Sequence, residues 1–93
     1  MPYKIKTYTK NKAKQLGVVV KQSTRKGKKI DVFDKYGKKL ASIGALGYSD
    51  YPTFIEEKGK LFAEQKRKNY KARHQKDRTK KYSNGWFADN LLW

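Results

Sequence analysis

The chain has 93 residues, with 24 lysine and arginine residues against 8 aspartate and glutamate residues, and its formal net charge is +16 at pH 7. This length fits one small domain, so we expect a single domain over residues 1–93. The chain has no cysteine and one histidine, which excludes disulfide bonds, thiolate chemistry and a metal site built from several cysteines or histidines of one chain. A positive charge of this size indicates a polyanionic partner.

No run of apolar residues approaches the ~20 residues that a membrane-spanning helix needs, so the sequence predicts no membrane-spanning segment. The cations near the N-terminus are not followed by an apolar stretch, which argues against a secretory signal. Residues 1–29 carry 10 lysines and arginines without an acidic residue, and residues 56–81 carry 11. We treat residues 1–28 as a basic N-terminal segment that a partner could order.

The pattern predicts an α+β domain that starts with a short N-terminal helix over about residues 10–16. Thr9 is a suitable N-cap for this helix, and Gly17 stands where a left-handed C-cap residue is common. The three valines that follow favour a short strand over residues 18–20, because β-branched side chains are frequent in strands.

A β-hairpin is predicted over about residues 29–43, as part of a small antiparallel sheet. Two largely apolar segments, residues 30–34 and 39–43, flank a loop that contains Gly37. A glycine is typical of hairpin loops of about three to five residues.

One long basic helix is predicted over about residues 53–78, followed by an aromatic C-terminal turn. Thr53 and Glu56 match the capping box, in which each side chain bonds a free backbone N–H group of the other residue. One face of this helix is apolar, and we expect it to pack on the core. That face consists of Phe54, Ile55, Leu61, Phe62 and Ala72.

A ridge of cations is predicted on the other side of this helix. Four basic residues recur at intervals of 7, 4 and 7, which places them within an arc of roughly 40° on an ideal helix. Any soluble helix directs lysine and arginine outward, but a ridge ~27 Å long could also contact several phosphates of a nucleic acid. The residues of this ridge are Lys60, Arg67, Lys71 and Arg78.

A second candidate for nucleic-acid binding is the basic loop over residues 21–29. It contains Gly27 but lacks the Gly-x-x-x-x-Gly-Lys pattern of a nucleotide-binding loop. Upstream, Tyr3 and Tyr8 lie among cations, so they either stack on the bases of a single strand or pack on the sheet. The cations of the loop are Lys21, Arg25, Lys26, Lys28 and Lys29.

The sequence predicts no enzyme, no metal site and no cofactor. His74 has Asp77 three residues later, so we expect a contact across one helical turn. No nucleophile or pair of carboxylates accompanies this histidine in the sequence. Asp31, Asp34 and Asp50 match neither the spacing nor the ligand number of a known metal-binding loop.

The C-terminal segment is rich in large apolar side chains and has two interpretations. Exposed together on a soluble monomer, these side chains would form a large apolar patch. They therefore either close the small core, with Leu61 and Phe62 as expected neighbours, or dock into a partner. The residues concerned are Trp86, Phe87, Leu91, Leu92 and Trp93.

Three segments resemble a family of small basic proteins of DNA viruses. They are residues 43–51, with Ile-Gly-Ala followed by Tyr-Ser-Asp-Tyr, residues 70–78, with Arg-His, and residues 85–93, with Gly-Trp and a final Leu-Leu-Trp. Similar proteins occur in nucleocytoplasmic large DNA viruses, in related polinton-like elements and in some phages. The resemblance covers about residues 28–93. For the residues before position 28, the role is inferred from their charge alone.

This resemblance implies a viral protein at the boundary between capsid and genome, and it implies no enzyme. We therefore expect a minor, capsid-associated virion protein whose basic surface contacts packaged nucleic acid or an acidic capsid surface. Its expected partners are nucleic acid, through the phosphate backbone, and other capsid proteins. Its expected location is the virion and, during infection, the host cell. The alternative is a non-virion protein that binds nucleic acid without sequence specificity during viral replication or transcription.

Overall fold

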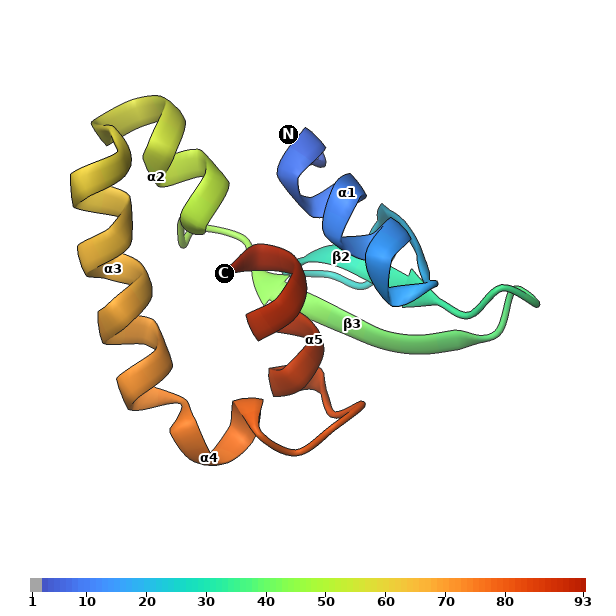
Figure 1. Cartoon of the computed structure of the whole chain (residues 1–93). Coiled ribbons are helices and arrows are strands. Elements are labelled where there is room, and N and C mark those ends of the chain that lie inside the picture. The colour runs from blue at the N-terminus through green and yellow to red at the C-terminus, as the bar shows by residue number, and fades with distance from the viewer. Residues whose placement is uncertain (1–2) are drawn as a thin grey trace.

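A computed structural model describes residues 3–93 and contains five helices and three strands in this part of the chain (Figure 1). The predicted α+β class is confirmed. The elements are α1 (Thr7–Leu16), β1 (Val19–Gln22), β2 (Lys28–Phe33), β3 (Lys39–Ala45), α2 (Tyr51–Lys58), α3 (Lys60–Arg73), α4 (Gln75–Arg78) and α5 (Asn84–Leu92).

The three strands form one antiparallel sheet in the order β1-β2-β3. Val20 of β1 pairs with Val32 of β2, and Ile30 of β2 pairs with Ile43 of β3. The predicted hairpin is therefore confirmed, with β2 and β3 as its arms. The strand predicted from the three valines is β1, which begins one residue later than expected and extends to Gln22.

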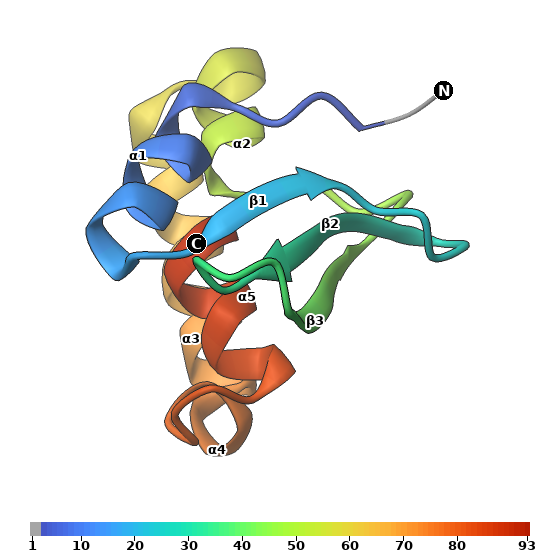
Figure 2. The same ribbon diagram turned by 90° about the vertical axis from the view of Figure 1, so that its right-hand side faces the viewer.

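The core lies between the sheet and the helices α1 and α5 (Figures 1 and 2). The C-terminal segment supplies much of it, because Phe87, Leu91 and Leu92 are only 1%, 0% and 2% exposed. Trp86 and Trp93 are half-buried and pack against the edge of this core. The other buried apolar side chains of the core are Ala13, Ile30, Val32, Ala41 and Ile43.

Helix α1 begins about three residues earlier than predicted, and Thr9 is not its N-cap. Lys6 holds the N-cap position without a side-chain hydrogen bond. Thr9 lies inside the helix, 0% exposed, and its hydroxyl group donates a hydrogen bond to the carbonyl oxygen of Leu91 at 2.8 Å. Gly17 ends the helix in the left-handed conformation at φ 75°, as predicted.

The prediction of one continuous helix over residues 53–78 is wrong, because the segment forms α2, α3 and α4. Asp50, not Thr53, is the N-cap of α2, and its carboxylate accepts a hydrogen bond from the Thr53 N–H group at 3.1 Å. Gly59, at φ 90° and ψ 167°, separates α2 from α3, and His74 separates α3 from α4. Figure 1 shows these three helices as a curved limb, yellow-green to orange, beside the body formed by α1, the sheet and α5.

The face of this segment that was predicted to pack on the core is largely exposed. Leu61, Phe62 and Ile55 are 91%, 41% and 36% exposed. Ala72 is exposed as well, and Phe54 is half-buried. A single helical wheel cannot describe these residues, because the break between α2 and α3 rotates the two helices relative to each other.

The basic N-terminal segment contributes α1 and β1 to the domain, and its residues 1–2 lie outside the described residues. Tyr8 donates a hydrogen bond from its hydroxyl group to the carbonyl oxygen of Trp93 at 3.1 Å. Tyr3 is half-buried and packs against the core. These two tyrosines thus make contacts within the domain. Over residues 3–93 no helix is long and apolar enough to cross a membrane.

We predict that Thr9→Val lowers the free energy of unfolding by about 1–3 kcal/mol, the usual cost of a buried polar group without a partner. The carbonyl group of Leu91 lies in the last turn of α5, where carbonyls lack a partner within the helix. Urea unfolding followed by circular dichroism measures the change. Thr7→Val is the matched control, because Thr7 is an exposed residue of the same helix, and an equal loss in both variants would contradict the prediction.

Candidate nucleic-acid interface

Most acidic side chains of the domain form hydrogen bonds or ion pairs with other groups of the protein. Within residues 3–93, seven of the 8 aspartates and glutamates accept a hydrogen bond or join an ion pair, and the exception is Glu57. Four of the 24 lysines and arginines pair with a carboxylate there, which leaves the other 20 without one. Unpaired cations therefore far outnumber the carboxylates that remain exposed, which are Glu56, Glu57, Glu64 and Asp77.

Asp50 is the centre of a buried polar network. Its Oδ2 atom lies 3.0 Å from the Lys29 Nζ atom, and the two side chains are 1% and 5% exposed. The hydroxyl groups of Tyr3 and Thr53 each donate a hydrogen bond to the carboxylate at 2.6 Å. Burial raises the pKa of the Asp50 carboxyl group, but the bonds from Thr53, Tyr3 and Lys29 outweigh burial and hold this pKa below its ordinary value.

Lys29 was predicted to contact nucleic acid. Its side chain is 5% exposed and its ammonium group is paired with Asp50, which argues against a contact with phosphate. The other cations of that loop, Lys21, Arg25 and Lys26, are exposed, and Lys28 is half-buried. Their contact with nucleic acid stays a prediction.

Asp31 forms a second polar network on the sheet. The hydroxyl groups of Ser23 and Ser42 and the N–H group of Thr24 donate hydrogen bonds to its carboxylate, and the Lys39 Nζ atom lies 3.3 Å from it. Burial alone would raise the pKa of the Asp31 carboxyl group, but these bonds outweigh burial and bring the pKa well below its ordinary value.

The predicted ridge of cations is not an exposed surface. Three of its members are half-buried and engaged by protein groups, and Lys60 alone of the four is exposed. The break at His74 also removes Arg78 from the regular helical spacing. The three contacts are the Arg67 guanidinium group 4.8 Å from the centroid of the Tyr51 ring, the Lys71 Nζ atom 2.6 Å from Asp89, and the Arg78 Nε atom donating to the Lys71 carbonyl oxygen at 3.1 Å.

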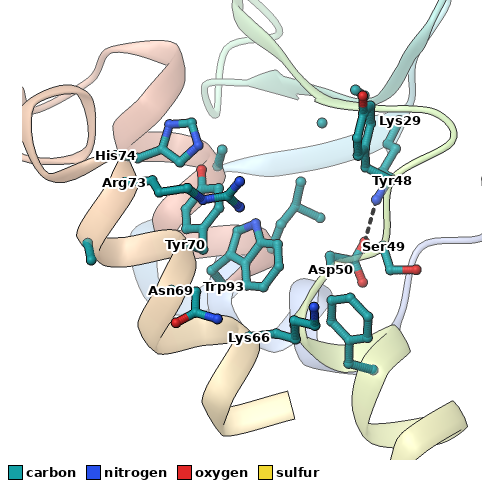
Figure 3. A pocket seen from close by; sticks show the side chains of 16 residues that line it. Lys29, Tyr48, Ser49, Asp50, Lys66, Asn69, Tyr70, Arg73, His74 and Trp93 are labelled. Atoms are coloured by element: carbon teal, nitrogen blue, oxygen red, sulfur yellow. Dashed lines mark hydrogen bonds and ion pairs between the residues drawn. The ribbon is translucent and has the colours of Figure 1, made fainter. Parts of the chain in front are cut away.

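The structure has a groove between the limb and the body instead. Two pockets of about 880 and 610 Å³ form it, and Gly44, Tyr70, His74 and Ala88 line both pockets, which are therefore adjacent. Helices α3 and α4 supply one wall of the groove. The end of β3, the turn after β3 and helix α5 supply the other wall. Figure 3 shows the larger pocket from close by.

Three aromatic side chains form a column along the larger pocket. The ring centroids of Tyr70 and Trp93 are 4.4 Å apart with an interplanar angle of 8°, and those of Tyr70 and His74 are also 4.4 Å apart with an angle of 29°. Tyr70 lies in the last turn of α3, His74 is the C-cap of this helix, and Trp93 follows α5, so the column joins the limb to the body (Figure 3). Burial raises the pKa of the Tyr70 hydroxyl group, which keeps the column uncharged at this ring.

The groove is rich in cations that have no carboxylate partner. Within residues 3–93 none of these cations forms an ion pair, and all but the half-buried Lys28 are exposed. The groove has two acidic side chains, the buried Asp50 and Asp77, whose Oδ2 atom lies 3.8 Å from the His74 Nδ1 atom. The predicted contact between His74 and Asp77 is thus present. The cations are Lys66 and Arg73 in the larger pocket, and Lys28, Lys76 and Lys80 in the smaller one.

Sequence reasoning missed most of this groove. Of the cations that line the groove, the sequence analysis named Lys28 and Lys29. It missed the other four cations, because it placed the residues of the limb on one straight helix. The sequence analysis included Tyr70, His74 and Trp93 only in the segments that resemble a family. It did not predict that they form a stacked column. Two aromatic rings at helical i and i+4 positions among cations are a signal that could have found the column.

A family of unknown function, DUF5754, is similar to this chain over residues 18–54. This region contains the three strands and the first turn of α2, but it excludes the limb wall of the groove and α5. No curated protein and no solved structure matches the chain. Among residues 3–93, histidine, aspartate and glutamate form no cluster of three that could hold a metal ion.

We predict that stability falls at acid pH because of Asp31 and Asp50. Both carboxyl groups have a pKa below their ordinary value in the folded chain. Their contribution is therefore complete above the unfolded-state pKa of about 4 and is lost as the pH falls through the folded-state values. The thermal midpoint of Asp31→Asn should be lower than that of the wild type at pH 7, and it should fall less between pH 5 and pH 3.

Glu57→Gln is the control for this experiment, because Glu57 is exposed and no hydrogen bond or ion pair is recorded for it within residues 3–93. Its pH profile should match that of the wild type. An Asp31→Asn profile parallel to the wild type from pH 7 to pH 3 would contradict the role given to this carboxylate.

Proposed function

We propose that the protein binds nucleic acid without sequence specificity, through the groove between the limb and the body. The observation that carries this proposal is the set of five cations without a carboxylate partner that line two adjacent pockets. Of the two acidic side chains of the groove, Asp50 is buried and paired with Lys29, whereas Asp77 is 72% exposed, so the five cations face one exposed carboxylate.

The chemistry of these cations favours the phosphate backbone over base edges. Each lysine or arginine that neutralises a phosphate releases condensed counterions, and this contribution does not depend on base sequence. Contacts to phosphate fix the position of a protein on nucleic acid but do not read its sequence. The proposed activity is therefore binding, with a strong dependence on salt concentration and no covalent chemistry.

We propose where the protein binds nucleic acid from the resemblance described above. Residues 43–51, 70–78 and 85–93 resemble small basic proteins of DNA viruses, and these segments supply much of the groove. We propose a minor capsid-associated virion protein that contacts packaged nucleic acid, with an acidic capsid surface as the other possible contact. A role in replication or transcription outside the virion is the second candidate.

The groove predicts which cations govern salt-dependent binding. Changing Lys66, Arg73, Lys76 and Lys80 to glutamine should reduce the slope of log K against log salt by about 2.8 for a single strand or about 3.6 for a duplex, at ~0.7 and ~0.9 per lost phosphate contact. Fluorescence anisotropy with a labelled 20-nucleotide strand and a 20-base-pair duplex, at salt concentrations from 50 to 300 mM, measures the slope.

A matched control removes four charges outside the groove, with Lys10, Lys14, Lys35 and Lys38 changed to glutamine. All four are exposed, on α1 and on the turn between β2 and β3, and none lines either pocket. This control should reduce the slope by less than half as much. A control that reduces it equally would assign binding to overall charge, and absence of wild-type binding at 50 mM salt would refute the proposed function.

The proposed location predicts that the protein copurifies with virus particles. Quantitative mass spectrometry of purified virions should find peptides of this chain at a constant number of copies per particle. Presence in infected-cell lysate together with absence from particles would favour the role outside the virion.

A further inference from the structure

We propose that the groove takes a single strand of nucleic acid and that one of its bases stacks on His74, at the end of the aromatic column. This inference rests on the proposed function and adds the class of strand and the point at which a base is held. The inference follows from the aromatic rings that line the groove. A groove that contacted only phosphates would not need these rings.

The column has one end at which a further ring can be added. Tyr70 has both faces covered, by Trp93 on one side and by His74 on the other. Within residues 3–93 no second aromatic ring stacks on His74, whose side chain is 41% exposed. Figure 3 shows the order Trp93, Tyr70, His74 along the α3 wall, with His74 at the outer end. A flat base on His74 would continue the column.

His74 also has the position in the groove that a stacked base requires. It lines both pockets, so it lies at the junction where they border each other. Lys66 and Arg73 line the pocket on one side of this junction, and Lys76 and Lys80 line the pocket on the other side. The phosphates before and after a base on His74 would thus each have cations within the groove.

The wall opposite the column carries a second aromatic side chain. Tyr48 lies in the turn between β3 and α2, lines the larger pocket and is 78% exposed (Figure 3). The larger pocket, at about 880 Å³, falls within the range of about 300–1,000 Å³ that encloses small organic ligands. It can therefore hold a neighbouring base against Tyr48.

A single strand is the form of nucleic acid that these rings suit. In a duplex the faces of the bases already stack on each other, whereas a single strand can splay its bases onto aromatic side chains. Stacking of this kind tolerates any base, because every base has an aromatic face. It therefore agrees with binding that has no sequence specificity.

The test compares three labelled ligands of equal length with the full-length protein at 150 mM salt: oligo(dT) of 20 nucleotides, an abasic strand with the same backbone, and a 20-base-pair duplex. Oligo(dT) should bind about 5- to 100-fold more tightly than the abasic strand, the fold-change that corresponds to one stacked base. His74→Ala should remove most of this ratio and leave the affinity for the abasic strand within about twofold.

Two further variants separate stacking from other effects. His74→Phe keeps an aromatic face and should retain the ratio, whereas loss of the ratio in this variant would overturn the proposed stacking. Tyr36→Ala is the control, because Tyr36 is 83% exposed on the turn between β2 and β3 and lines neither pocket. It should leave all three affinities unchanged.

The outcomes distinguish this inference from the proposed function. Equal affinity for oligo(dT) and the abasic strand, or tighter binding of the duplex, would overturn the inference and leave salt-dependent nucleic-acid binding intact. Failure of the wild type to bind any of the three ligands at 50 mM salt would overturn both.

Discussion

The carboxylate of Asp50 connects three parts of the molecule: the sheet, the N-terminal segment and the limb. It pairs with Lys29 of β2, accepts a hydrogen bond from Tyr3 of the N-terminal segment, and caps the first helix of the limb. Removing one partner of a buried ion pair costs about 3–5 kcal/mol, because the other charge is left buried alone. A small domain has only about 5–15 kcal/mol of stability, so this contact is a large share of what keeps the domain folded.

The same use of carboxylates explains the character of the surface. A net charge of +16 on a chain of 93 residues opposes compaction through self-repulsion. The chain places Asp31 and Asp50 inside, where hydrogen bonds stabilise their charged forms. These carboxylates stabilise the fold and at the same time leave the surface with few negative charges. The burial of Asp31 and Asp50 therefore contributes both to the stability of the fold and to the excess of positive charge on its surface.

The parts of the fold that local sequence determines were predictable, and the parts that depend on distant contacts were not. The turn of the hairpin and the left-handed C-cap at Gly17 are properties of a few neighbouring residues. A glycine inside a helix usually weakens it by no more than ~1 kcal/mol, but Gly59, at φ 90°, separates two helices. The burial of Lys29 could not be foreseen either, because its partner Asp50 lies 21 positions away in the sequence.

The groove itself follows from the break at Gly59 and from the division of the C-terminal segment between two tasks. A straight helix over residues 53–78 would carry its cations away from the body, and no wall would face α5. With the break, α3 returns alongside the body, and Tyr70 meets Trp93. In α5, Phe87 and Leu91 are separated by one helical turn and point into the core, whereas Trp93 follows the end of the helix and reaches α3. The side chains inside α5 therefore close the core, as the first interpretation predicted, and Trp93 both packs against this core and stacks on Tyr70. Docking of this segment into a partner stays a prediction.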